Sequence, residues 1–309
     1  MEFFVQILIS AVVMGTPLLF ATLGGVISER AGVINLGMEG LMLVGALVAF
    51  IVMLNTGNYF LAVAAAALSS GIVSIIHGVV CLTLRASQIA SGLALTFFGT
   101  GLSGLFGDKL IGETIEPLNR IPIPGLNAIP LLGPVLFNHD VLVYFSYVCV
   151  ALLWWMLYKT RLGLNIRSMG EAPEVCDSLG LSVISYRYFA IISGGMLIGI
   201  GGAYFPLALT PFWVDGITGG RGWIAVALVI FAFWDPVKAL GGAYLFGLAL
   251  SLELRLQILG IEMSPYFLKM LPFILTILVL TLVTIRNNRR GIQVMPAALG
   301  KVFFRGEKH

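Results

Sequence analysis

Four polar side chains stand inside or beside apolar runs of this 309-residue sequence, and they are its first candidates for chemistry. Asn35 and Glu39 are four residues apart, so on a helix they would share one face. Gln88 opens another apolar run, and Arg221 precedes a third. Because polar groups in apolar surroundings are costly unless paired, we expect these four to lie on a solute path or to hold irregular backbone.

Each of these residues also has a purely structural interpretation, and the sequence leaves both open. Asn35 could cap the helix that follows it, with Glu39 in the first turn of that helix. Gln88 could form a hydrogen bond between helices, and Arg221 could anchor in lipid headgroups instead of forming a gate. If Glu39 carried a proton, the chain would be a secondary transporter driven by an ion gradient.

No catalytic motif accompanies these residues. The only Gly-Lys pair, Gly300-Lys301, lacks the spacing of a Walker A loop, and no HExxH, CxxC or GxSxG occurs. The three histidines and three cysteines are scattered along the chain, which predicts neither a metal site nor a disulfide scaffold. We therefore expect no enzyme activity, no cofactor and no nucleic-acid partner.

Composition places the chain in a membrane. Apolar residues make up 59% and charged residues 11%, against roughly 25% charged in soluble domains. Apolar runs of spanning length predict an all-α, polytopic integral membrane protein with about nine transmembrane helices (8–10). The short run 222–234 is a candidate for a broken or re-entrant helix. The predicted spans are 3–27, 37–54, 59–84, 89–106, 141–158, 187–209, 222–234, 237–256 and 267–285.

The basic residues set the orientation. With an external N-terminus, alternating spans leave most lysines and arginines in the cytoplasm, as the positive-inside rule favours. Only five basic residues then lie outside: Lys109, Arg120, Arg221, Arg255 and Lys269. The predicted organisation is one transmembrane domain, 1–285, with an external loop 107–140, a cytoplasmic loop 159–186 and a basic cytoplasmic tail 286–309.

The cytoplasmic loop contains a pattern typical of a short amphipathic helix. We predict it between Gly170 and Gly180, with Glu171 and Glu174 in its first turn and Pro173 tolerated near its start. Gly180 suits the residue after the C-cap. One apolar stripe would contain Ala172, Val175, Cys176 and Leu179.

This helix could lie at the lipid surface, but its polar side is acidic, whereas helices that seek anionic leaflets are rich in lysine and arginine. Insertion into a groove of a cytoplasmic partner fits better. A second packing motif, Gly195 and Gly199 at GxxxG spacing, predicts close helix contact. That contact could join two subunits, but we favour packing inside this chain.

Several of these segments resemble a known family. Gly170-Glu171-Ala172-Pro173, followed by Ser178-Leu179-Gly180-Leu181, is similar to the coupling segment of ATP-binding-cassette (ABC) importer permeases for simple sugars, nucleosides and branched-chain amino acids. The stretch 23–46 resembles the signature of nucleoside permeases paired with basic-membrane-protein-type lipoproteins. The stretches 85–92 and 220–225 also resemble that subgroup, although other members often carry Gln where Arg221 stands.

The resemblance implies a permease of the inner membrane that imports a nucleoside, or otherwise a simple sugar or a branched-chain amino acid. Its implied partners are a separate ABC ATPase, a second permease subunit in a heterodimer, an external solute-binding lipoprotein and membrane lipid. It also implies that the predicted short helix docks on the ATPase through Gly170, Glu171, Ala172, Pro173, Val175, Leu179 and Gly180. Asn35, Glu39, Gln88 and Arg221 would then lie on the substrate path.

Overall fold

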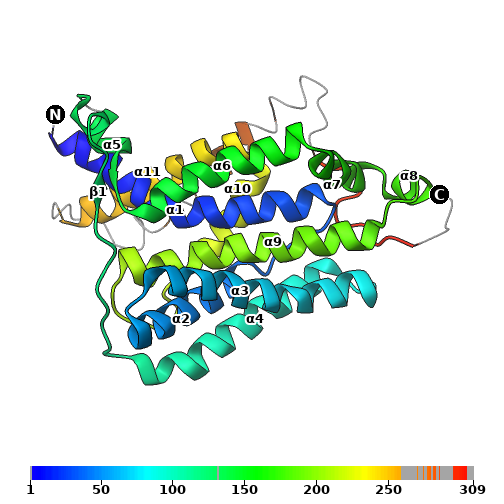
Figure 1. The fold of residues 1–309 in the computed structure, drawn as a ribbon, viewed down its shortest axis with the longest axis horizontal. Helices are drawn as coiled ribbons and strands as arrows, with labels where there is room; N and C mark the ends of the chain where they lie inside the picture. The colour runs from blue at the N-terminus through cyan, green and yellow to red at the C-terminus, as the bar shows by residue number, and fades with distance from the viewer. Residues whose placement is uncertain are drawn as a thin grey trace.

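The computed structural model describes residues 2–130, 132–258 and 295–304, with isolated positions between 270 and 285. Long helices run side by side along the molecule (Figure 1). The N-terminus lies at the end that carries the short helix α5 (Leu132–Leu136), and α8 (Pro173–Ser178) lies at the opposite end. We call these the α5 end and the α8 end.

Eight of the nine predicted spans are helices. Among the described residues, six are long and apolar enough to cross a membrane, which confirms a polytopic helical membrane protein. The ninth predicted span, 267–285, lies outside the described residues apart from isolated helical positions. The eight helices are α1 (Glu2–Arg30), α2 (Met38–Thr56), α3 (Tyr59–Gly78), α4 (Gln88–Gly107), α6 (Val141–Lys159), α9 (Val183–Tyr204), α10 (Arg221–Phe231) and α11 (Pro236–Ile258).

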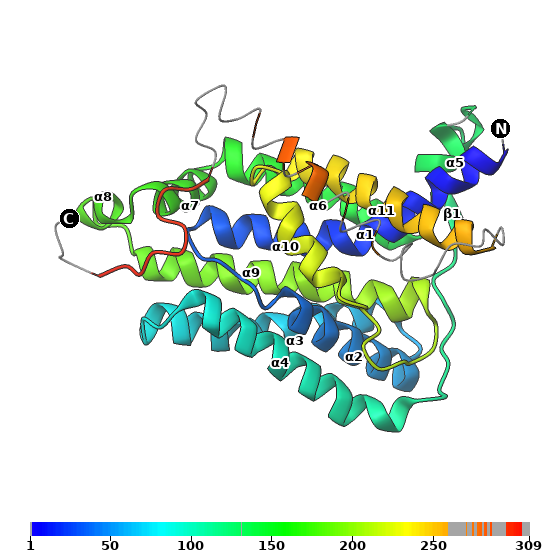
Figure 2. The same cartoon turned by 180° about the vertical axis from the view of Figure 1, so that it is seen from behind.

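Helix α10 is too short to span a bilayer. Its 11 residues rise about 16 Å, roughly half of a bilayer's hydrocarbon core. Gly219 and Gly220 precede it with φ of 58° and 79°, conformations that glycine adopts without strain, and they end the loop from residue 210. Figure 2 shows α10 beginning partway along the long helices and ending nearer the α8 end. This is the broken segment that the sequence predicted.

A second break separates α1 from α2. Residues 31–37 are not helical, and they carry the chain from the α8 end to the middle of the helix layer. The start of α2 lies level with the middle of α4, because a side chain at Gly40 would meet Leu95 and Thr96. Consequently the first turn of α2 lies inside the molecule instead of at its surface.

Helix α9 is the centre of the helix packing and contacts α1, α2 and α3. A Cβ atom on Gly199 would lie 2.5 Å from the Ala66 carbonyl oxygen of α3, and one on Gly195 would lie 2.6 Å from the Ser74 side chain. Gly24 of α1 and Gly194 of α9 approach each other in the same way. The GxxxG motif therefore packs inside the chain, as favoured from the sequence.

The loop between α4 and α6 is largely irregular and lies at the α5 end. It contains a two-stranded antiparallel sheet, in which Ile121 pairs with His139, and its start forms bridges to the segment that follows α9. The short elements of this loop are a 3₁₀ turn (Asp108–Leu110), β1 (Ile121–Pro122), a second 3₁₀ turn (Leu126–Ala128), α5 and β2 (Asn138–His139).

The predicted helix between Gly170 and Gly180 is α8, but it begins later than predicted, at Pro173, and a separate helix precedes it. α7 (Arg161–Glu171) ends one residue before α8, and Ala172 between them has φ −145° and ψ 75°. Proline disfavours helical backbone in the residue before it, so Pro173 begins a new helix. Glu171 therefore ends α7 and does not lie in the first turn of α8.

The glycine packing of α9 predicts the effect of one substitution. Gly199→Ala would force its methyl group against the Ala66 carbonyl, so the detergent-solubilised protein should unfold at a lower temperature or fail to accumulate. Gly101→Ala on α4 is the matched control, because a Cβ atom there would meet nothing within 4 Å. Equal melting temperatures for the two variants would contradict this packing.

Candidate functional site

The Glu39 carboxylate joins the two broken segments. Its Oε1 accepts hydrogen bonds from the Thr218 hydroxyl at 2.5 Å and the Gly220 amide at 2.9 Å, and its Oε2 accepts one from the Gly222 amide at 2.6 Å. The side chain is 7% exposed. A carboxylate at a helix N-terminus pairs with amides that have no partner within the helix and with the positive end of the helix dipole. Glu39 of α2 thus caps α10.

Gly222 makes this junction possible. A Cβ atom on Gly222 would lie 2.5 Å from the Glu39 Cα atom, closer than real side chains come. A glycine at this position therefore lets the first turns of α2 and α10 touch through their backbones. We call the contact among Glu39, Thr218, Gly220 and Gly222 the junction.

Arg221 lies beside the junction and faces the protein. Its guanidinium stands 5.1 Å from the centre of the Phe205 ring, and the carboxylates of Glu253 and Glu39 attract it electrostatically. The side chain is only partly exposed. These contacts are those of a cation held among internal partners rather than those of a headgroup anchor.

Asn35 and Gln88 hold the irregular segment 31–37. Asn35 Oδ1 accepts from the Gly37 amide at 2.9 Å, which closes a turn just before α2 rather than capping its first turn. Gln88 Oε1 accepts from the Ile34 amide at 2.8 Å. Gln88 is therefore a support of the backbone between helices. The Asn35 Nδ2 atom is buried and has no partner among the described residues.

Two further side chains support the same segment, and the sequence did not single them out. His77 of α3 donates from Nε2 to the Ile34 carbonyl at 3.0 Å, and its Nδ1 lies 3.0 Å from the Ser91 hydroxyl. Thr96 of α4 donates to the Leu36 carbonyl at 3.0 Å. Side chains of α3 and α4 thus provide partners for the backbone of Ile34 and Leu36.

At the α8 end, α8 presents an exposed apolar pair. Val175 is 57% exposed and Leu179 74% exposed, whereas Cys176 is buried. The predicted stripe is therefore divided, because Cys176 packs inward whereas Val175 and Leu179 point outward. Burial raises the pKa of the Cys176 thiol, and the Glu174 carboxylate raises it further, so this cysteine remains a neutral packing group.

The end of α8 has the geometry predicted for Gly180. Gly180 has φ 80°, its amide donates to the Asp177 carbonyl, and the Leu181 amide donates to the Cys176 carbonyl at 3.0 Å. This hydrogen-bond pair is a Schellman motif, which ends a helix at the residue before a glycine. The prediction that Gly180 follows the C-cap of this helix is confirmed.

Arginines attach this end to the helix layer. Arg187 of α9 is 1% exposed and donates to the Ala31 carbonyl at 3.0 Å and to the Met169 carbonyl of α7 at 3.4 Å. Arg30 donates to the Trp234 carbonyl at 2.8 Å, where the chain turns from α10 into α11. Gly170 packs directly on the Arg30 backbone. Movement of α7 would therefore reach the ends of α1 and α10.

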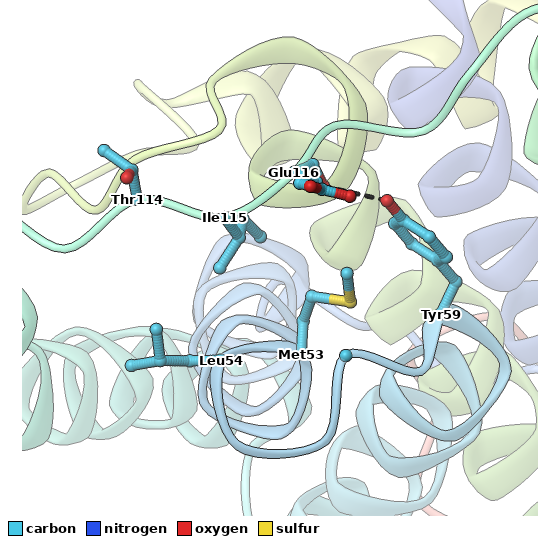
Figure 3. Close-up of a pocket in the computed structure, with 7 residues that line it drawn as sticks. Met53, Leu54, Tyr59, Thr114, Ile115 and Glu116 are labelled. Atoms are coloured by element: carbon cyan, nitrogen blue, oxygen red, sulfur yellow. Dashed lines mark hydrogen bonds between the residues drawn. The ribbon is translucent and has the colours of Figure 1, made fainter.

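A pocket of about 240 Å³ opens at the α5 end (Figure 3). The turn between α2 and α3 forms one side of it, and the start of the 107–140 loop forms the other. The Tyr59 hydroxyl donates to the Glu116 carbonyl oxygen at 3.1 Å across the pocket's edge. Its lining comprises Met53, Leu54, Gly57, Tyr59, Thr114, Ile115 and Glu116.

Comparison with known proteins identifies the family. Residues 7–280 match the family described as "Branched-chain amino acid transport system / permease component". The chain belongs to this permease family. It is 41% identical to the putative glucose ABC transporter permease protein TsgC13 of Haloferax volcanii, with 97% of each chain covered.

Two nucleoside permeases are also similar to this chain. It is 37% identical to the nucleoside ABC transporter permease protein NupC of Lactococcus lactis, over 89% of this chain and 91% of that protein. It is 36% identical to the guanosine ABC transporter permease protein NupQ of Bacillus subtilis, over 88% of this chain and 90% of that protein. This permease is thus a membrane subunit of an ABC importer, as the resemblance implied.

The junction predicts the effect of removing its carboxylate. Glu39→Ala would leave the Thr218 hydroxyl and two amides of the permease without acceptors, at a cost of about 1–3 kcal/mol for each buried donor. We expect a clearly lower melting temperature in detergent and little solute uptake. Glu39→Gln keeps one carbonyl oxygen as an acceptor, so its melting temperature should lie between those of Glu39→Ala and the wild type.

Asp108→Asn is the control for this measurement, because it removes a carboxylate that is exposed at the α5 end. It should melt at the wild-type temperature. Wild-type melting of Glu39→Ala would show that the carboxylate does not hold α10.

Proposed function

We propose that this permease imports a neutral polar solute, most readily a nucleoside and otherwise a simple sugar, past the junction of α2 and α10. The observation that carries the proposal is the junction itself. In transporters, discontinuous helices meet where the substrate passes, because their unpaired ends provide polar groups within the membrane. Here two discontinuous segments meet about halfway along the long helices.

The charge of the junction favours an uncharged substrate. A free helix N-terminus would attract the carboxylate of an amino acid or a phosphate group. At α10 that position is filled by the Glu39 carboxylate, which accepts the amides of Gly220 and Gly222. The relatives named for glucose, nucleosides and guanosine support the same choice over a branched-chain amino acid.

The rival mechanism, in which Glu39 carries a proton, is disfavoured by the same bonds. Both carboxylate oxygens accept from protein donors, and a proton on either would compete with Thr218 or a backbone amide. We therefore assign Glu39 to the support of α10, and the energy for transport to ATP.

We assign the ATPase to the α8 end. Val175 and Leu179 project from a short helix at the tip of the molecule, where a partner's groove could bury them. Basic residues gather at this end, which the positive-inside rule places in the cytoplasm together with the C-terminus. They are Arg30, Arg85, Lys159, Arg161, Arg167 and Lys238.

The external binding lipoprotein would then dock at the α5 end. That end carries the irregular loop 107–140 and the pocket beside Glu116 (Figure 3), whose volume of about 240 Å³ is large enough for one side chain of a partner. A second permease subunit would complete the path. The exposed apolar residues of α3 and α4 face either that subunit or lipid, since a large share of both helices is exposed.

The assignment of the ATPase to α8 predicts the effect of introducing two negative charges on that helix. Val175→Asp with Leu179→Asp would place carboxylates in an apolar contact, so the permease should insert in the membrane but lose its ATPase and its solute uptake. Copurification of the tagged permease with the ATPase, together with uptake in proteoliposomes, measures both effects.

The control is Leu84→Asp, the same change at another exposed leucine of the α8 end, on the turn before α4. It should retain the ATPase. Normal uptake by the double variant would overturn the assignment of α8 to the ATPase.

The substrate assignment requires a test on the assembled importer. We expect unlabelled nucleosides to compete with uptake of labelled guanosine into proteoliposomes, glucose to compete weakly, and leucine not at all. A thermal-shift screen of the cognate binding protein with the same solutes provides an independent measurement. A shift with leucine alone would restore the branched-chain amino acid as the substrate.

A further inference from the structure

Residues 295–304 form a strap across the α8 end, although the sequence predicted only a basic tail there. Pro296 and Ala298 are buried, and Leu299 and Phe303 are partly buried against the protein. In Figure 1 the strap is the red segment between α7 and α9. We name residues 295–304 the strap.

One side of the strap holds the segment that we assign to the ATPase. The Ala298 amide donates to the Gly170 carbonyl at the end of α7 at 2.8 Å, and the Ala297 amide donates to Glu171 Oε2 at 3.2 Å. Phe303 packs against the cluster of Met169, Cys176 and Val183, which unites α7, α8 and α9. The strap is thus fixed to the base of α8.

The other side of the strap holds the irregular segment that leads to the junction. The Gly300 amide donates to the Gly32 carbonyl at 3.2 Å, and the Lys301 carbonyl accepts from Gln88 Nε2 at 3.5 Å. Gln88 also binds the Ile34 amide, so the strap and 31–37 share one side chain. A Cβ atom on Gly300 would lie 2.8 Å from Ile34 Cδ1.

We propose that the strap transmits movement of α7 and α8 to the segment 31–37, and through it to Glu39, so that ATP hydrolysis is coupled to opening of the path. This proposal rests on the docking of the ATPase at α8. Its physical basis is that the strap touches both segments through backbone hydrogen bonds, which have fixed lengths and directions. Gly300 and Gln88 act as positioning residues, because neither needs to touch the solute.

The backbone conformation of Gly300 provides a variant that disturbs the strap at one position. Gly300 has φ 76°, so Gly300→Val strains the strap and pushes on Ile34. Gly216→Val is the matched control, since Gly216 has φ 63° and a Cβ atom there would meet nothing within 4 Å. The two substitutions therefore carry similar local strain and differ in what they contact.

The measurement is solute uptake per ATP hydrolysed by the complete importer in proteoliposomes, with and without loaded binding protein. We expect Gly300→Val to assemble and to hydrolyse ATP at the basal rate, but to lose at least about fivefold in uptake per ATP. Gly216→Val should match the wild type. A chain ending before Met295 should lose more than Gly300→Val, and one ending after Phe304 should lose nothing.

Each alternative result is informative. Unchanged coupling in Gly300→Val overturns the proposal, and this holds even if the chain that ends before Met295 fails to assemble, because the strap would then serve folding alone. If the variant with Val175→Asp and Leu179→Asp kept its ATPase and its uptake, the assignment of the ATPase to α8 would fail first. Coupling lost in Gly216→Val as well would also overturn the proposal, since general strain would explain both variants.

Discussion

The three hydrogen bonds of the Glu39 carboxylate are the interaction on which the rest of this permease depends. A buried carboxylate is costly unless its oxygens are paired, and here they accept from Thr218, Gly220 and Gly222. The same carboxylate gives an acceptor to the amides at the start of α10, which have no partner within the helix and lie in a region with little water. Without that carboxylate, a helix of 11 residues would begin inside the protein with unpaired donors.

The abundance of glycine follows from the same junction. Two helix ends can share one carboxylate only if their backbones almost touch, which Gly222 allows. The helices around the junction must then also approach closely, and Gly40 and Gly99 bring α2 and α4 together in this way. In a membrane, such contacts provide the van der Waals packing that stabilises helices against one another, since burial of apolar surface from water contributes little there. Many of the 37 glycines are thus a requirement of packing.

The spans and the short helix α10 could be predicted because hydropathy and length depend only on neighbouring residues. Gly180 was predictable for the same reason, since a Schellman motif is local. The partners of Glu39 were not, because Thr218 is 179 positions away in the sequence. The division of α7 from α8 at Ala172 was accessible from the restriction that Pro173 imposes, but the helical spacing of the apolar residues concealed it. The strap was missed because its contacts are mostly made by backbone amides and carbonyls.

The irregular segment 31–37 is the part of this fold best suited to change shape. A transmembrane helix loses many backbone hydrogen bonds if it bends, whereas this segment is held by a few side chains, among them Gln88, His77 and Thr96. Exchanging such partners would produce discrete alternative arrangements of the segment. Asn35 Nδ2, buried without a partner among the described residues, is a donor that another arrangement could satisfy. Because Glu39 follows directly after this segment, a change there would move the start of α10 while leaving the long helices intact.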